Sequence, residues 1–151
     1  MIAVLAGLLL VLAAGPPRAA TTERIVVDRF TGLAISGYDP VAFFIDGKPV
    51  LGDADIELAY AGAIWRFCNP GNREAFAANP EVYAPQFGGY DPVGVARGTA
   101  VAGNPNLWVI SGGRLFLFYD NDRLQAFTAD ADRMAATAER RWPEVLNTLS
   151  P

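Results

Sequence analysis

Asp-Pro and Asn-Pro dipeptides recur through the middle of this chain. They include Asp39-Pro40, Asn69-Pro70, Asn79-Pro80 and Asp91-Pro92. Proline suits the first turn of a helix, and an Asp or Asn directly before it can cap the helix start. The pattern therefore predicts short helices that begin at 39–40, 69–70 and 91–92, while Asn79-Pro80 ends the second helix and opens a further turn.

Two segments between and after these helix starts predict β-hairpins. Residues 57–67 alternate around Ala61-Gly62, and residues 107–119 surround Ser111-Gly112-Gly113. Asp130 can cap a C-terminal helix over residues 131–141, which Pro143 should interrupt. We therefore expect an α+β fold in which the two hairpins pair into one small antiparallel sheet, with short helices between them and a C-terminal helix. One shared core should bury the large aromatic residues Trp65, Phe67, Phe76, Trp108 and Phe116.

One short motif occurs twice. Gly-Tyr-Asp-Pro-Val stands at residues 37–41 and again at residues 89–93, but the flanking sequences do not visibly repeat. A duplicated module would extend over a whole supersecondary unit. The motif is therefore interpreted as two similar helix starts rather than as a duplication.

Length and composition bound the class of protein. The chain has 151 residues, of which 52% are hydrophobic and 19% charged, which predicts a single globular domain over residues 24–149. The formal net charge is −4 and the cations are scattered along the sequence. Nucleic-acid binding needs clustered cations, so it is excluded as a function class.

The N-terminal segment resembles a secretion signal. Residues 1–14 carry no charge, and Gly15-Pro16-Pro17 ends the apolar run, which is too short to span a bilayer comfortably. We interpret residues 1–20 as a signal peptide or apolar leader and expect a periplasmic or secreted protein. A cytosolic protein whose apolar N-terminus joins the core is the alternative, and a membrane is expected as a partner only if the leader stays uncleaved.

The inventory of reactive side chains is small. The sequence has no histidine and one cysteine, Cys68. It therefore lacks the commonest general base and transition-metal ligand, and it cannot form an intramolecular disulfide.

The order of residues 37–44, 65–68 and 72–90 resembles that of the YHS-domain family, in particular its exported bacterial members. The resemblance runs from about Leu33 to Trp142. In metal-binding members the pattern implies cysteine ligands, but here Ala42, Asn72 and Asp91 stand at such positions and only Cys68 matches. Structural zinc is excluded within one chain, because one Cys and no His cannot complete a four-ligand site.

Five residues are the candidates for ligand binding: Tyr38, Asp39, Cys68, Tyr90 and Asp91. We expect no catalytic residue and no cofactor, and we predict a non-enzymatic binding or interaction domain with a small ligand or protein partner, accessory to metal handling by resemblance, with a degenerate metal site. Helix capping by Asp39 and Asp91, and simple packing by Cys68, are the plainer interpretations. The alternative is a copper-binding or thiol redox protein that uses Cys68.

The leader predicts that the mature protein begins between residues 15 and 24, because the apolar run has the length of a signal core. Expression in a Gram-negative host followed by intact-mass measurement of the exported protein checks this. A soluble cytoplasmic protein that retains Met1 would contradict it.

Overall fold

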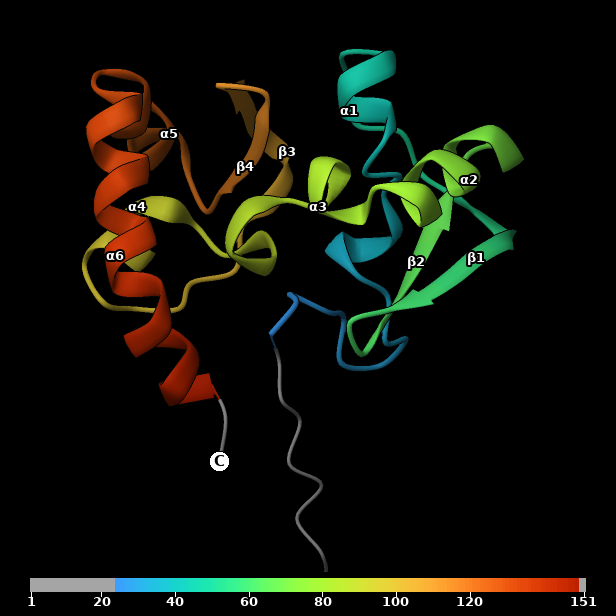
Figure 1. The fold of residues 1–151 in the computed structure, drawn as a ribbon, viewed down its shortest axis with the longest axis horizontal. Coiled ribbons are helices and arrows are strands. Elements are labelled where there is room, and N and C mark those ends of the chain that lie inside the picture. The colour runs from blue at the N-terminus through green and yellow to red at the C-terminus, as the bar shows by residue number, and fades with distance from the viewer. Residues whose placement is uncertain (1–23, 150–151) are drawn as a thin grey trace, which may run out of the picture.

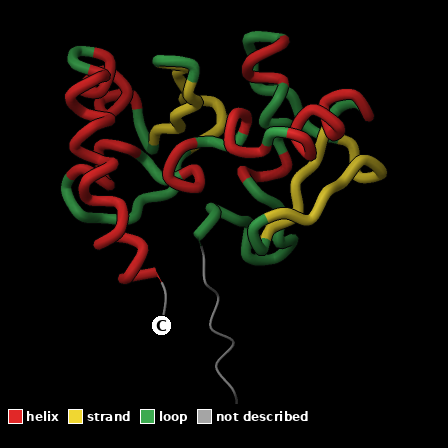
Figure 2. Tube along the Cα trace, in the orientation of Figure 1, coloured by secondary structure: helices red, strands yellow, loops and turns green. Residues whose placement is uncertain are grey.

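The computed structural model describes residues 24–149, so the predicted leader lies outside the described part of the chain. The α+β class is confirmed, with two hairpins, short helices between them and a long C-terminal helix (Figures 1 and 2). Within residues 24–149, no helix has both the length and the apolar character needed to cross a bilayer.

The elements fall into two groups along the chain, which form the first half and the second half of the fold. The first group comprises η1 (Ile35–Gly37), α1 (Ala42–Ile45), β1 (Asp53–Tyr60), β2 (Ala63–Phe67), α2 (Pro70–Ala78) and α3 (Pro80–Tyr83). The second comprises η2 (Gln86–Gly89), α4 (Pro92–Ala96), β3 (Asn104–Ser111), β4 (Arg114–Phe118), α5 (Asn121–Thr128) and α6 (Ala131–Leu149). Helices begin after Asn69 and Asp91, whose side chains accept the predicted capping hydrogen bonds.

The two hairpins do not pair into one sheet, contrary to the sequence-based expectation. β1 pairs only with β2 and β3 only with β4, both antiparallel, among the described strands. The reason lies in β4, whose alternate residues face different cores. Leu115 and Leu117 join one buried cluster, whereas Phe116 and Phe118 join the other. The second hairpin thus separates two hydrophobic layers and contacts the first half through side chains.

The repeated motif belongs to a structural repeat, so its interpretation as two similar helix starts rather than a duplication is wrong. Tyr38 and Tyr90 share the same backbone angles, φ −74° and ψ 148°. The amide of Asp39 donates to the carbonyl of Val50, and the amide of Asp91 donates to the carbonyl of Val101, both at 2.8 Å. Each motif precedes a hairpin and then a capped helix. The supersecondary unit is therefore present twice.

The hairpins repeat in detail as well. The register shifts after Asp53↔Phe67 in the first hairpin and after Asn104↔Phe118 in the second. A glycine precedes each bulged strand. A Cβ on Gly52 would lie 2.4 Å from the Cβ of Arg66, and one on Gly103 would lie 2.6 Å from the Cβ of Leu117, so only glycine fits at either position. In both halves the second strand of the hairpin therefore passes close to the backbone of this glycine.

The predicted shared core is instead two cores of the same design. In the first, Phe76 contacts Trp65 and Phe67 with ring centroids 4.9 and 5.3 Å away. In the second, Phe127 contacts Phe116 and Phe118 at 4.8 and 5.2 Å. All six rings are fully buried. Trp108 is only partly buried and packs on the first core, with its ring 5.2 Å from that of Phe43.

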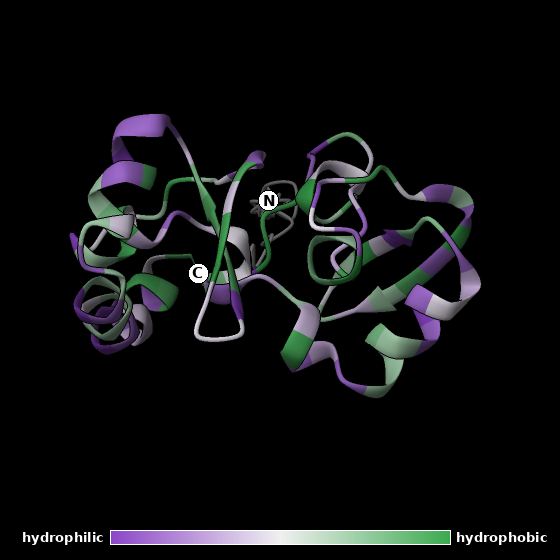
Figure 3. Cartoon of the chain, turned by 90° about the horizontal axis from the view of Figure 1, so that it is seen from above, coloured by the Kyte–Doolittle hydropathy of each residue, from purple (hydrophilic) through white to green (hydrophobic). Residues whose placement is uncertain are grey.

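The C-terminal helix does not stop before Pro143, as the sequence suggested, but runs through it to Leu149. Residues on either side of the proline hold the helix against the second core. Trp142 contacts Phe87 with centroids 5.5 Å apart, and Val145 is buried. Tertiary packing therefore outweighs the local cost of proline. Figure 3 shows hydrophobic residues along the strands near the middle of the view, and both hydrophilic and hydrophobic residues on the flanking helices.

The repeat predicts that Phe76→Ala and Phe127→Ala destabilise the protein equally. Each replacement should lower the free energy of unfolding by about 3–5 kcal/mol, because each removes a buried ring that contacts two others. Urea denaturation followed by fluorescence measures the loss, and Phe30→Ala is the exposed control, since Phe30 is 98% exposed. A loss below about 1 kcal/mol for either core variant would show that the two cores are not equivalent.

Candidate functional site

The buried carboxylate of Asp39 ties three segments of the first half together. Its Oδ1 accepts hydrogen bonds from the amides of Val41 at 2.8 Å and Ala42 at 3.3 Å. Its Oδ2 accepts from the amide of Cys68 at 2.9 Å and from the side-chain amide of Asn72 at 2.7 Å. Asp39 is fully buried. The carboxylate therefore fixes the start of α1, the end of β2 and the first turn of α2.

Cys68 lies at the end of β2, immediately before the capping residue of α2, and is half-buried. The side-chain amides of Asn69 and Asn72 reach its Sγ at 3.4 and 3.5 Å. Burial, followed by hydrogen bonding to Asp39 and its negative charge, raises the pKa of Cys68 to about 11. The thiol is therefore protonated at neutral pH, which makes it a weak nucleophile and a weak metal ligand.

Asp91 occupies the equivalent position in the second half and makes equivalent contacts. Its Oδ1 accepts from the amide of Gly94 and its Oδ2 from the amide of Tyr119, both at 2.8 Å. Arg123 stands where the first half has Asn72, and its Nη1 lies 3.5 Å from Asp91 Oδ1. A Cβ on Gly94 would lie 3.2 Å from that nitrogen, so glycine makes room for the guanidinium.

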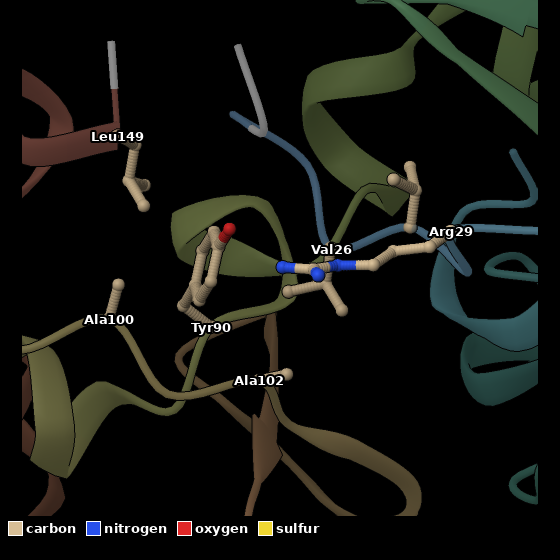
Figure 4. A pocket seen from close by; sticks show the side chains of 7 residues that line it. Val26, Arg29, Tyr90, Ala100, Ala102 and Leu149 are labelled. Carbon is tan, nitrogen blue, oxygen red and sulfur yellow. The ribbon is translucent and has the colours of Figure 1, made fainter. Parts of the chain in front are cut away.

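The two motif tyrosines have different surroundings. Tyr38 is half-buried, and its hydroxyl accepts a 3.4 Å hydrogen bond from the side-chain amide of Asn106. Tyr90 is 6% exposed and lines a pocket of about 290 Å³ together with Arg29. Figure 4 shows the hydroxyl of Tyr90 and the guanidinium of Arg29 pointing toward the same part of this pocket.

The five candidate residues thus do not form one site. The structure brings Asp39 and Cys68 together, whereas Asp91 and Tyr90 lie in the second half and Tyr38 contacts Asn106. Within residues 24–149, no group of three or more Cys, Asp and Glu side chains is placed to hold a metal ion.

The sequence did not single out Arg29 or the small residues that line the pocket. The turn that carries Arg29 is set by Asp28, which accepts hydrogen bonds from Phe30 and Thr31. These bonds, chiefly the one from the Thr31 amide, lower the pKa of Asp28. No pattern in the sequence links this turn to Tyr90, because the pocket that Arg29 and Tyr90 both line depends on how the N-terminal segment crosses the second half.

Comparison of the chain with protein-family models, curated proteins and solved structures gives no match. The resemblance to the YHS-domain family therefore stays a prediction that depends on the motifs of the sequence.

The buried contacts predict that Asp39→Asn and Asp91→Asn destabilise the fold. In the asparagine variants, one acceptor oxygen of the carboxylate becomes an NH2 group, which cannot accept a hydrogen bond. One of the N–H groups that the carboxylate now satisfies is then left without an acceptor. Leaving a buried group unsatisfied costs about 1–3 kcal/mol, so the midpoint of urea unfolding should fall clearly. Asp122→Asn is the exposed control and should leave the midpoint unchanged. Unchanged stability in both core variants would instead favour carboxylates reserved for an external ligand.

Proposed function

We propose that this chain is an exported, non-enzymatic binding module of the YHS-like type, acting in the periplasm or outside the cell. The observation that carries the proposal is the internal use of its reactive groups. Asp39 and Asp91 accept hydrogen bonds that hold the fold together, and the thiol of Cys68 has a raised pKa of about 11. A binding role uses surfaces and pockets and needs none of these groups as an acid, base or nucleophile.

The chemistry around Cys68 does not favour thiol catalysis. An activated cysteine has a lowered pKa, usually through a neighbouring cation or His. Here the nearest charged groups that affect the thiol are carboxylates, Asp39 and Asp46, and both raise its pKa. The environment therefore opposes formation of the thiolate that nucleophilic or redox chemistry requires.

The donor set also fits copper poorly. Cu(I) is held by several soft sulfur or nitrogen ligands. The groups nearest to Cys68 Sγ are the amide nitrogens of Asn69 and Asn72, which donate hydrogen bonds and do not serve as soft ligands. A remnant of the YHS metal site, with its ligands replaced, accounts for this arrangement.

The proposal predicts slow alkylation of Cys68. With a pKa of about 11 against the ordinary value of 9.0, the folded protein should react with iodoacetamide at pH 8 about 100-fold more slowly than the urea-denatured chain. Because the folded-state pKa is raised, the rate should keep rising above pH 9, with a midpoint near pH 11. Mass spectrometry measures the rate, and Cys68→Ser is the unreactive control.

The copper alternative is tested on the same pair of proteins. Reduced protein is titrated with Cu(I) against a competing chelator while its oligomeric state is followed by light scattering. Equal, weak binding by the native chain and Cys68→Ser supports the proposal. Tight binding that requires Cys68, or fast alkylation at pH 7, would overturn it in favour of a metal-binding or redox protein.

A further inference from the structure

The described part of the chain begins with a short segment that lies between the two halves (Figure 1). We call residues 24–27 the strap. The amide of Val26 donates to the carbonyl of Gly88 in the second half at 2.8 Å, and the carbonyl of Val26 accepts from the amide of Ile35 in the first half at 3.0 Å. A single residue of the strap is therefore bonded to both halves through its backbone.

The side chains of the strap are divided between the two cores in the same way as those of β4. Ile25 and Val27 pack against the first core, whereas Val26 packs against the second. Val27 also forms an antiparallel bridge with Ala34. Successive side chains of a β segment point to opposite sides, so three consecutive β-branched residues can reach both cores. The strap is thus a second link between the halves, beside β4.

Gly88 is the residue that makes room for the strap. A Cβ on Gly88 would lie 1.9 Å from the carbonyl oxygen of Arg24, so a side chain there would displace the strap. At the equivalent position of the first half, one residue before the repeated motif, stands Ser36. The two backbones nearly match, with φ 57° and ψ 26° at Ser36 and φ 63° and ψ 16° at Gly88. Because this backbone carries a serine in the first half, the passage of the strap, and not the turn itself, explains the glycine.

We propose that the strap is a closing device: when it docks on Gly88 and Ile35 it locks the two halves into one body, and when it is released the halves open independently. Val26 and Val27 also line the pocket beside Tyr90, so release of the strap would remove one wall of that pocket. The predicted cleavage window at residues 15–24 keeps the whole strap in the mature chain, whereas trimming beyond Val26 would abolish the lock. The inference goes beyond the proposed function and does not depend on which ligand the module binds.

Hydrogen exchange of the full exported chain, followed at single amides by NMR, tests the inference. In the native chain the amides of Val26 and Ile35 should exchange slowly, and the amides of β2 and β4 should lose their protection at the same urea concentration. Gly88→Ser, which installs the residue of the first half, should speed exchange of the Val26 and Ile35 amides at least about tenfold and separate the two urea midpoints. Ser36→Gly is the reciprocal control, and it should change neither result because Ser36 is exposed.

Three results would overturn the inference. Fast exchange of the Val26 and Ile35 amides in the native chain would show that the strap is not docked. Unchanged exchange in Gly88→Ser would show that Gly88 does not admit the strap. Release of the strap with coinciding midpoints would mean that β4 alone couples the halves. If Gly88→Ser does not fold, Val26→Pro takes its place in the same assay, since it removes the donor to Gly88 and leaves the second half unaltered. None of these results involves Cys68, so the tests of the proposed function remain separate.

Discussion

The fold depends on one interaction that is made twice: a fully buried carboxylate that accepts the amide of the first residue after a hairpin. Asp39 accepts from Cys68 and Asp91 from Tyr119. A buried carboxylate is unfavourable unless its oxygens are satisfied, so each one imposes a fixed arrangement on the turn, the strand end and the next helix. The positions of the candidate residues around Asp39 and Asp91 therefore follow from the hydrogen bonds that hold each half together.

The two halves solve the same electrostatic problem differently. In the first half, the neutral side-chain amide of Asn72 donates a hydrogen bond to Asp39, and Ala42 fits beside this carboxylate. In the second, the guanidinium of Arg123 lies 3.5 Å from Asp91, and Gly94 in place of alanine leaves more room for it, because a Cβ there would lie 3.2 Å from the guanidinium. Charge, side-chain length and a missing Cβ have thus changed together. Burial is the main cause of the raised pKa of Cys68, and in this half the carboxylate of Asp39, which has no arginine beside it, raises that pKa further.

The parts of the fold that could be predicted from the sequence are those that depend on local interactions. Helix starts at Asn69 and Asp91 and the turns of both hairpins were correct, because capping and turn chemistry act within a few residues. The duplication was missed because the two halves share contacts rather than residue types. Trp65 and Phe67 occupy the positions of Phe116 and Phe118, and Cys68 occupies that of Tyr119. The continuation of α6 through Pro143 was missed for the same reason, since Trp142 and Val145 are held by distant residues.

The repeat also changes how the candidate residues are weighed. A position that carries the same residue in both halves, such as Asp39 and Asp91, is explained by the shared fold and needs no ligand. Positions that differ while the backbone stays the same are where a half can acquire a role of its own. Cys68 against Tyr119 and Leu51 against Ala102 are such positions. The first change leaves a protonated thiol, whereas the second lies in a pocket that Arg29 and Tyr90 also line.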